Sequence, residues 1–205
     1  MITLGPGRRS LRRTPGLIFW RSLGTGSGAD TGPGADLART ALLGVWDSEE
    51  AHDRFVGHAW PQAVESWHVR LDPLGGHGSW GGFDLLAGAV DTTDPTGPIA
   101  MITRADVRLR RWRTFRSAGP SVSDELRAAG GLLGVVGIGE APVGRQGTFS
   151  LWTDAAAATA FARSPQHAAV VRRTRAEGWY GEELFARFRP IDAHGSWDGR
   201  NPLAP

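Results

Sequence analysis

The sequence contains neither cysteine nor lysine. The absence of cysteine limits the cross-links and metal sites that the protein can form. Without cysteine, disulfides, Cys-ligated zinc and iron–sulfur clusters are excluded. Any metal or metallocofactor must therefore be held by His, Asp, Glu, Tyr or Met. No window approaches the roughly 18 apolar residues that span a bilayer. Residues Met1 to Gly16 are basic but lack the apolar core of a signal peptide, so we expect a cytoplasmic protein.

The basic residues are all arginine, 23 in number, and the net charge is only +2. Clusters of arginine occur at residues 8–9, 12–13, 108–116 and 172–175. None of them is interleaved with aromatic residues as in a known nucleic-acid module, and no helix-turn-helix or zinc-finger spacing is present. We therefore expect no nucleic-acid partner, and we attribute the use of arginine in place of lysine to genome composition.

The chain contains an internal repeat. Residues 65–82 read ESWHVRLDPLGGHGSWGG and residues 182–199 read EELFARFRPIDAHGSWDG, 117 positions later and without a gap. The match aligns Glu65 with Glu182 and both copies of His-Gly-Ser-Trp. Upstream, Val45-Trp46-Asp47 matches Leu151-Trp152-Thr153-Asp154, and Leu23 to Gly26 matches Val136 to Gly139. Because the order of these landmarks is the same in both halves, we interpret the chain as a duplication.

The second copy predicts the order β-α-β-β-α-β of a ferredoxin-like module. We expect strands at 99–109, 132–138, 146–152 and 184–189, and helices at 121–129, 154–163 and 165–177. Pro165 opens the last helix and Gly178 ends it. The fold class is therefore α+β, with two tandem modules packed as an α+β barrel. We expect the first module at residues 1–82, a linker at 83–97 and the second module at 98–205.

The first copy is shorter at its start. In the second copy 39 residues separate Pro98 from Gly137, whereas only 23 residues precede the matching Gly24. That is too few for both a strand and a helix. Either the start codon is placed too far downstream, or Met1 to Leu4 forms a stunted edge strand. We expect the first module to lack its leading strand and to leave a sheet edge uncovered beside Leu17 to Leu23.

Several stretches resemble spheroidene monooxygenases, and together they cover nearly the whole chain from Arg12 to Pro202. The most specific is GTFSLWTDAAAATAFARSPQHAAVVRRTRAEGWYGEELFARFRPI at 147–191, joined by segments at 14–28, 41–55, 98–108, 137–142 and 194–202. The sequence departs from the family at its start and at Val135-Val136. The resemblance implies a haem-containing monooxygenase that oxidises an acyclic carotenoid or similar apolar substrate. It also implies a ferredoxin-type electron donor. Association with a membrane surface and a homodimer are left open.

A proximal histidine is the expected axial ligand of haem in a chain without cysteine. His167 lies in the first turns of the helix expected at 165–177, on a mostly apolar stripe with Val170 and Val171. From the residues alone, a satisfied core histidine is the more common interpretation of such a position. Related two-copy barrels that bind haem place the proximal histidine on a helix of the second copy, and that analogy favours His167. His52 and His58 are predicted to be solvated, His68 to lie in a strand, and His77 and His194 to be structural.

Arginine forks suit the carboxylates of haem propionates. Candidate partners are Arg104, Arg145 and either Arg163 or Arg172, although solvated arginine is the plainer interpretation of each. The aromatic residues Phe149, Trp152, Phe161 and Trp179 are candidates for a substrate pocket, although such residues more often form core. The glycines at 24–28 do not have the spacing of a dinucleotide-binding loop. The alternative function is a cofactor-free oxygenase or a non-catalytic ligand-binding or oligomerising module of the same fold.

Overall fold

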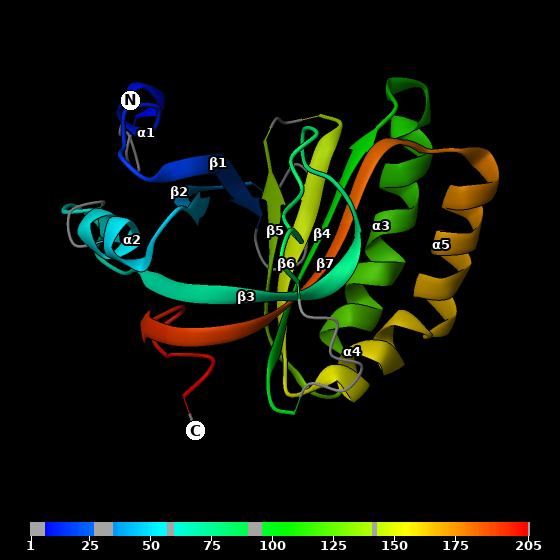
Figure 1. The fold of residues 1–205 in the computed structure, drawn as a ribbon. Coiled ribbons are helices and arrows are strands. Elements are labelled where there is room, and N and C mark those ends of the chain that lie inside the picture. Colours follow the sequence, from blue (N-terminus) through cyan, green and yellow to red (C-terminus); the bar gives the residue numbers. More distant parts are fainter. Residues whose placement is uncertain (1–6, 27–34, 57–59, 90–95, 141–142, 205) are drawn as a thin grey trace.

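The computed structural model describes residues 7–26, 35–56, 60–89, 96–140 and 143–204. Two of the residues considered above, His58 and the segment Met1 to Leu4, lie outside these ranges. The fold is a curved antiparallel sheet with one helix layer on its outer face (Figure 1). The expected α+β class is therefore confirmed.

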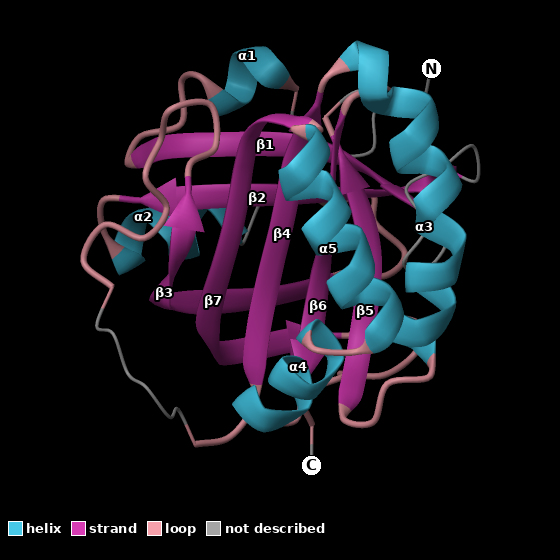
Figure 2. Cartoon of the chain, turned by 90° about the vertical axis from the view of Figure 1, so that its right-hand side faces the viewer, coloured by secondary structure: helices cyan, strands magenta, loops and turns pink. Residues whose placement is uncertain are grey.

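The second half has the predicted order of elements. Its strands are β4 (Ile99–Val107), β5 (Leu132–Gly139), β6 (Arg145–Trp152) and β7 (Tyr180–Gly195). Its helices are η1 (Leu109–Arg111), α3 (Trp112–Arg127), α4 (Ala155–Ala162) and α5 (Pro165–Glu177). The left-handed conformation of Gly178, at φ 60°, ends α5 as its sequence predicts. Figure 2 shows α3, α4 and α5 lying over one face of these strands.

Helix α3 differs from the prediction. The sequence places a helix start after Gly119-Pro120, but α3 begins at Trp112 and contains Pro120 in its interior. Proline in a helix removes one backbone hydrogen bond, so local propensity argues against this helix. Packing overrides it here, because the ring of Phe115 lies against both Trp179 and Tyr180, with centroids 6.5 and 6.2 Å away.

The first half contains fewer elements. It consists of α1 (Arg8–Leu11), β1 (Leu17–Gly26), β2 (Ala35–Trp46), α2 (Glu49–Val56) and β3 (Trp67–Gly78). Within the described ranges no strand precedes β1, and the expectation of a shortened first module stays a prediction. Residues 75–78 belong to β3 and pair with β7.

The sheet contains seven strands in the order β2-β1-β5-β6-β4-β7-β3. Two junctions join the halves, and each pairs a strand with its repeat counterpart. Strand β1 runs antiparallel to β5, and β3 runs antiparallel to β7. A pairing of equivalent antiparallel strands is what a twofold relation between two copies produces. The two halves are therefore arranged about a pseudo-twofold axis, which supports the duplication. The exact boundaries at residues 82, 83–97 and 98 stay a prediction.

Local details of the two halves repeat as well. Gly16 and Gly131 both have φ near 79°, and a side chain on either would contact the first turn of the following helix. The amide of Asp47 bonds to Gly16 at 2.9 Å, and that of Thr153 bonds to Gly131 at 2.8 Å. Each turn thus needs glycine for its conformation and for space.

Two apolar cores lie on opposite faces of the sheet. The interior of the curved sheet is filled by residues including Ala100, Ile102 and Phe188, together with Trp80 from the turn after β3. The outer face packs Ile99, Met101 and Trp152 against the helix layer. Because side chains alternate along a strand, residues an odd number apart on one regular strand face different cores. None of the helices in the described ranges is long and apolar enough to span a membrane.

Candidate functional site

His167 lies at the N-terminal end of α5, where three elements meet. Helix α4 ends before Arg163, and Ser164 and Pro165 start α5 at once. Glu125 of α3 accepts hydrogen bonds from the Ser164 hydroxyl and from the amide of His167 at 3.0 Å. These bonds, that from Ser164 first, keep the pKa of Glu125 below its ordinary value of 4.5. The carboxylate therefore fixes the first turn of α5 against α3.

The imidazole of His167 is held in one tautomer. Its Nδ1 lies 3.0 Å from the carbonyl oxygen of Ala162. A carbonyl oxygen can only accept, so Nδ1 carries the proton and donates. In the neutral imidazole the second ring nitrogen, Nε2, then has the lone pair. This is the arrangement of a metal-ligating histidine whose other nitrogen bonds to a backbone carbonyl. It is equally a satisfied histidine in a protein core.

The four predicted pocket aromatics do not come together. The ring of Phe161 packs at a tilt of 43° against that of His167, with centroids 4.8 Å apart, and Trp152 stacks on Phe161 at 5.5 Å. Phe149 lies on the other face of β6, near Trp197 in the barrel interior. Positions 149 and 152 are three residues apart on one strand, so they face opposite cores. Trp179 is fully buried beyond the C-terminal end of α5.

The predicted arginines are also dispersed. Arg145, at the start of β6, is exposed and forms an ion pair of 3.4 Å with Asp106. Arg163 and Arg172 are exposed, at the end of α4 and on α5. Arg172 follows His167 by five residues, so it lies on another side of the helix. Arg104 is only 4% exposed and belongs to the barrel face of β4, away from His167.

Arg104 is the centre of a buried ion-pair network that sequence reasoning did not identify. Its guanidinium forms ion pairs with Glu182 of β7 and with Glu140 at the end of β5, the latter at 3.0 Å. Glu140 also accepts from the indole of Trp80 at 2.8 Å and pairs with Arg21 of β1 at 3.3 Å. The network therefore ties both halves together at one end of the barrel.

Glu182 is strongly stabilised as a carboxylate. Burial opposes its ionisation, but hydrogen bonds from Gly81, Gly82 and Ser79, together with Arg104, outweigh burial and lower its pKa from 4.5 to about 2. The bonds from the three residues of the turn measure 2.9 to 3.1 Å. The carboxylate thus holds the first His-Gly-Ser-Trp turn on the second half.

The repeat counterpart of this contact is present on the other side. Glu65, which aligns with Glu182, accepts from Ser196 at 2.8 Å and from the amide of Gly199 at 2.7 Å. Each glutamate therefore holds the turn of the opposite copy. The sequence aligned the two glutamates and the two turns. The sequence could not show that each glutamate binds the turn of the other copy, because that contact depends on the antiparallel pairing of β3 with β7.

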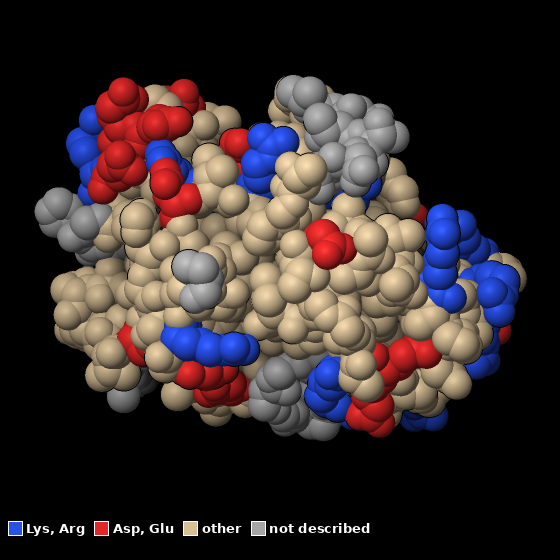
Figure 3. All heavy atoms as spheres, turned by 90° about the horizontal axis from the view of Figure 1, so that it is seen from below, with Lys and Arg blue, Asp and Glu red and all other residues tan. Residues whose placement is uncertain are grey.

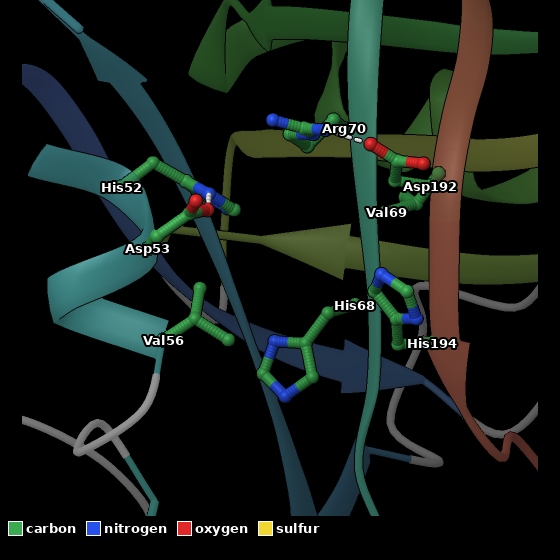
Figure 4. Close-up of a pocket in the computed structure, with 8 residues that line it drawn as sticks. All are labelled: His52, Asp53, Val56, His68, Val69, Arg70, Asp192 and His194. Atoms are coloured by element: carbon green, nitrogen blue, oxygen red, sulfur yellow. Dashed lines mark hydrogen bonds and ion pairs between the residues drawn. The ribbon is translucent and has the colours of Figure 1, made fainter. Parts of the chain in front are cut away.

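A cavity of about 370 Å³ lies at the other end of the molecule, between α2 and strands β3 and β7. Figure 4 shows its three histidines: His52 on α2, His68 on β3 and His194 on β7. Burial, followed by the neighbouring His52 and His194, lowers the pKa of His68 from 6.5. In the described part of the chain no group of three or more His, Asp or Glu side chains could hold a metal ion. The cavity is therefore not a multi-ligand metal centre.

Charged side chains are unevenly distributed on the surface. Exposed arginines gather on the helix layer, where Figure 3 shows them at the right-hand side. They come from η1 and α3 and from α5, and comprise Arg110, Arg113, Arg116, Arg172, Arg173 and Arg175. Acidic residues such as Glu49, Glu50 and Asp53 concentrate on α2. The helix layer that carries His167 is thus a basic surface.

Comparison with known proteins gives three close relatives, all named spheroidene monooxygenase. The protein from Rhodobacter capsulatus is 36% identical, over 96% of this chain and 85% of its own length. That from Rubrivivax gelatinosus is 35% identical, over 91% of this chain and 73% of its own. The one from Cereibacter sphaeroides is 32% identical over 92% of this chain, which spans 60% of that longer protein. No protein-family model matches the chain.

Solved structures show a weaker likeness. A candidate monooxygenase from Fusobacterium nucleatum has a TM-score of 0.47 at 8% identity, over 94% of this chain and 84% of its own. One from Lactobacillus acidophilus has a TM-score of 0.44 at 9% identity, over 88% and 80% of the two chains. Likenesses at this level have no bearing on function.

Proposed function

Because this chain belongs to the spheroidene monooxygenase family, we propose that it inserts one atom of O2 into an acyclic carotenoid or a similar apolar substrate. Membership of the family makes it an oxidoreductase of the monooxygenase class. In the proposed reaction a substrate C–H bond, O2, two electrons and two protons give a C–OH group and water. The observation that supports the proposal is 36% identity over 85% of a relative that bears this name.

The cofactor that we propose is haem, with His167 as its protein ligand. The test of fit is the chemistry of the side chain. The imidazole of His167 is half-buried, and its Nδ1 is directed to the Ala162 carbonyl, so that Nε2 is the nitrogen available to a ligand. Such a group can bind iron without burying a charge. The ring of Phe161 lies beside the imidazole, and Arg163 at the end of α4 is an exposed cation that could pair with a propionate. These residues fit the group.

When bound, haem would supply the one-electron and O2 chemistry that no side chain of this protein can supply. The protein contributes orientation. Glu125 fixes the first turn of α5 and the Ala162 carbonyl fixes the ring, so the position of Nε2 is set by two independent contacts. Arg104 is not part of this arrangement, because both ends of its guanidinium are bonded to Glu140 and Glu182 on the barrel side.

The electron donor that we propose is an acidic protein of the ferredoxin type. The exposed arginines of α3 and α5 give the helix layer a positive surface. Complementary charge accelerates the encounter of two proteins and orients them. Association with a membrane surface is a further proposal, because it would bring the protein to a lipid-soluble substrate. Formation of a homodimer is a separate proposal.

The reaction is tested by product analysis under isotopically labelled O2. The haem-reconstituted protein, an acyclic carotenoid, a ferredoxin and its reductase are incubated together, and the product is analysed by mass spectrometry. Incorporation of one labelled oxygen atom per product is expected, and it should stop when the reductant is omitted. Unlabelled product would mean that oxygen comes from water and would refute the monooxygenase reaction. Labelled product from haem-free protein would instead favour a cofactor-free oxygenase.

A further inference from the structure

Three connections between elements meet at one end of the helix layer. The amide of Val107, the last residue of β4, donates to the carbonyl oxygen of Gly144 at 2.7 Å. The amide of the next residue, Arg108, donates to Trp179 at 2.9 Å. Figure 1 shows the connection from β4 to α3 and that from α5 to β7 at the same end of the two helices. We call the surface formed there the loop surface; it comprises residues 107–113, 143–145 and 178–180.

Two large aliphatic side chains of the loop surface are exposed. Leu109 in η1 is 78% exposed, and Val143, just before β6, is 45% exposed. A single exposed apolar residue is common on any protein and needs no explanation. These two, however, come from different connections and lie one and two residues from the bonded pair Val107 and Gly144. The fold therefore brings two exposed aliphatic side chains to the same end of the molecule.

Arginines flank the two aliphatic side chains. Residues 108–116 include five arginines and no acidic residue. Among the described residues, the ion pairs of the loop surface are those of Arg111 with Glu177 and of Arg145 with Asp106. The exposed Arg110 and Arg113 thus have no acidic partner in the described part of the chain.

The position of these charges is unfavourable for the isolated fold. The first turn of α3 contains no acidic side chain, so Arg113 adds its charge to the positive end of the helix dipole. An anionic surface placed against the loop surface would remove this repulsion. The charge distribution therefore favours an anionic partner.

The aliphatic side chains decide which anionic partner fits best. Arginine alone suits any polyanion, including a nucleic acid or an acidic protein. A bilayer surface offers lipid phosphates to the cations and, a few ångströms deeper, an apolar layer to Leu109 and Val143. Trp112, half-buried at the start of α3, is of a residue type that is enriched at this boundary. A lipid surface is thus the partner that satisfies both kinds of side chain.

We propose that the loop surface docks on an anionic lipid bilayer, with Leu109 and Val143 at the boundary of headgroups and acyl chains and Arg110 and Arg113 on lipid phosphates. The proposal gives the membrane association proposed above a place in the fold. It rests on the proposed function for its purpose, which is access to a lipid-soluble substrate. His167 lies at the other end of α5, about 16 Å from Gly178 along the helix axis. The docking surface is therefore separate from the candidate haem site.

The absence of cysteine allows a direct test of insertion. Leu109→Cys, and Leu37→Cys as the matched control, each carry one polarity-sensitive fluorophore on the full chain. Leu37 is 88% exposed, but it lies on β2. The probes are vesicles of phosphatidylcholine, alone or mixed with phosphatidylglycerol in equal parts. Emission at position 109 should shift to the blue with the mixed vesicles only, and emission at position 37 should not shift with either.

Vesicle sedimentation of unlabelled variants gives the strength of docking. Leu109→Ser should lower partitioning into the mixed vesicles by about tenfold, the effect expected for one inserted leucine, whereas Leu37→Ser should not lower it. Arg113→Gln should lower it by about fivefold, the effect of one arginine near an anionic surface. Arg127→Gln removes the same charge at the other end of α3 and should have no such effect. Circular dichroism first shows that each variant is folded.

Three results would overturn the proposal. An unshifted fluorophore at position 109 would exclude insertion, and equal losses for Arg113→Gln and Arg127→Gln would mean diffuse attraction of a basic protein. A shift at position 109 with an acidic soluble protein, but not with vesicles, would make the loop surface a protein-docking site. The vesicle assays need neither haem nor turnover. Their failure would leave the proposed reaction standing, and failure of the labelled-O2 experiment would not change their result.

Discussion

Replacement of Glu182 by glutamine should destabilise the protein, because it removes one of the two charged partners of the buried Arg104. Arg104 is 4% exposed and would keep only Glu140 as a charged partner. Breaking a buried ion pair by removing one partner costs about 3–5 kcal/mol. Glu182 itself is 26% exposed, so water can replace part of the interaction. We therefore expect a loss of about 2 kcal/mol in the free energy of unfolding.

The pKa of Glu182 gives an independent bound. It falls from 4.5 in the unfolded chain to about 2 in the fold. At about 1.4 kcal/mol per pKa unit the carboxylate contributes at most ~3 kcal/mol, and solvent screening lowers this figure. Because the folded pKa is depressed, the contribution is complete above pH 4.5 and is lost as the pH falls through about 2. The difference between wild type and Glu182→Gln should shrink over that range.

The assay is urea unfolding of both proteins between pH 7 and pH 2, with Glu65→Gln as the matched control. Glu65 holds the equivalent turn, but its bonds come from neutral donors, Ser196 and Gly199. Its replacement should therefore lower the free energy of unfolding by less than that of Glu182. Equal losses for both variants would mean that the buried arginine is not what makes Glu182 important. A difference that stays constant down to pH 2 would refute the electrostatic explanation.

Three further predictions concern the framework. Gly131→Ala should lower stability by about 1–3 kcal/mol in thermal unfolding, because φ is 79° and the new methyl group would lie 2.6 Å from Ala157, whereas the neighbouring Gly130→Ala should be tolerated. Glu125→Gln should speed hydrogen exchange at the amides of the first turn of α5. In the wild type the same faster exchange should appear as the pH falls below 4.5, because the folded pKa of Glu125 is depressed and protonation weakens its hydrogen bonds. An NMR titration should give His68 a pKa below 6.5, because burial disfavours the charged ring. A pKa at or above 6.5 would mean that the cavity is solvated.

Much of the second half could be predicted from its sequence because local signals agree with the fold. Asp154 caps α4, Pro165 opens α5 and Gly178 closes it, each in the role that its residue type favours. Helix α3 was predicted too short because Gly119 and Pro120 are unfavourable within a helix. Its true start depends on aromatic contacts with Trp179 and Tyr180, which come from a distant part of the chain.

The candidate site was less accessible to prediction. His167 was selected from its apolar stripe with Val170 and Val171 and by analogy, whereas its contacts with Ala162 and Phe161 come from the structure. Arg104 was predicted as a candidate partner of haem propionates, but its partners in the structure, Glu140 and Glu182, lie 36 and 78 positions away in the sequence. Such distances are set by the order of strands in the sheet. The face of β4 on which Arg104 lies decides its role, and a one-residue change in register would reverse that face.

The central claim, that His167 is the protein ligand of a haem, is tested most directly by the absorption spectrum of reconstituted protein. Wild type is mixed with haem, freed of excess and compared with His167→Ala, His77→Ala and His194→Ala, each first shown to be folded by circular dichroism. The account predicts a Soret band in wild type and in both turn variants, and its loss in His167→Ala. A Soret band that persists in His167→Ala, with lowered stability alone, would make His167 a hydrogen-bonded core histidine and contradict the claim.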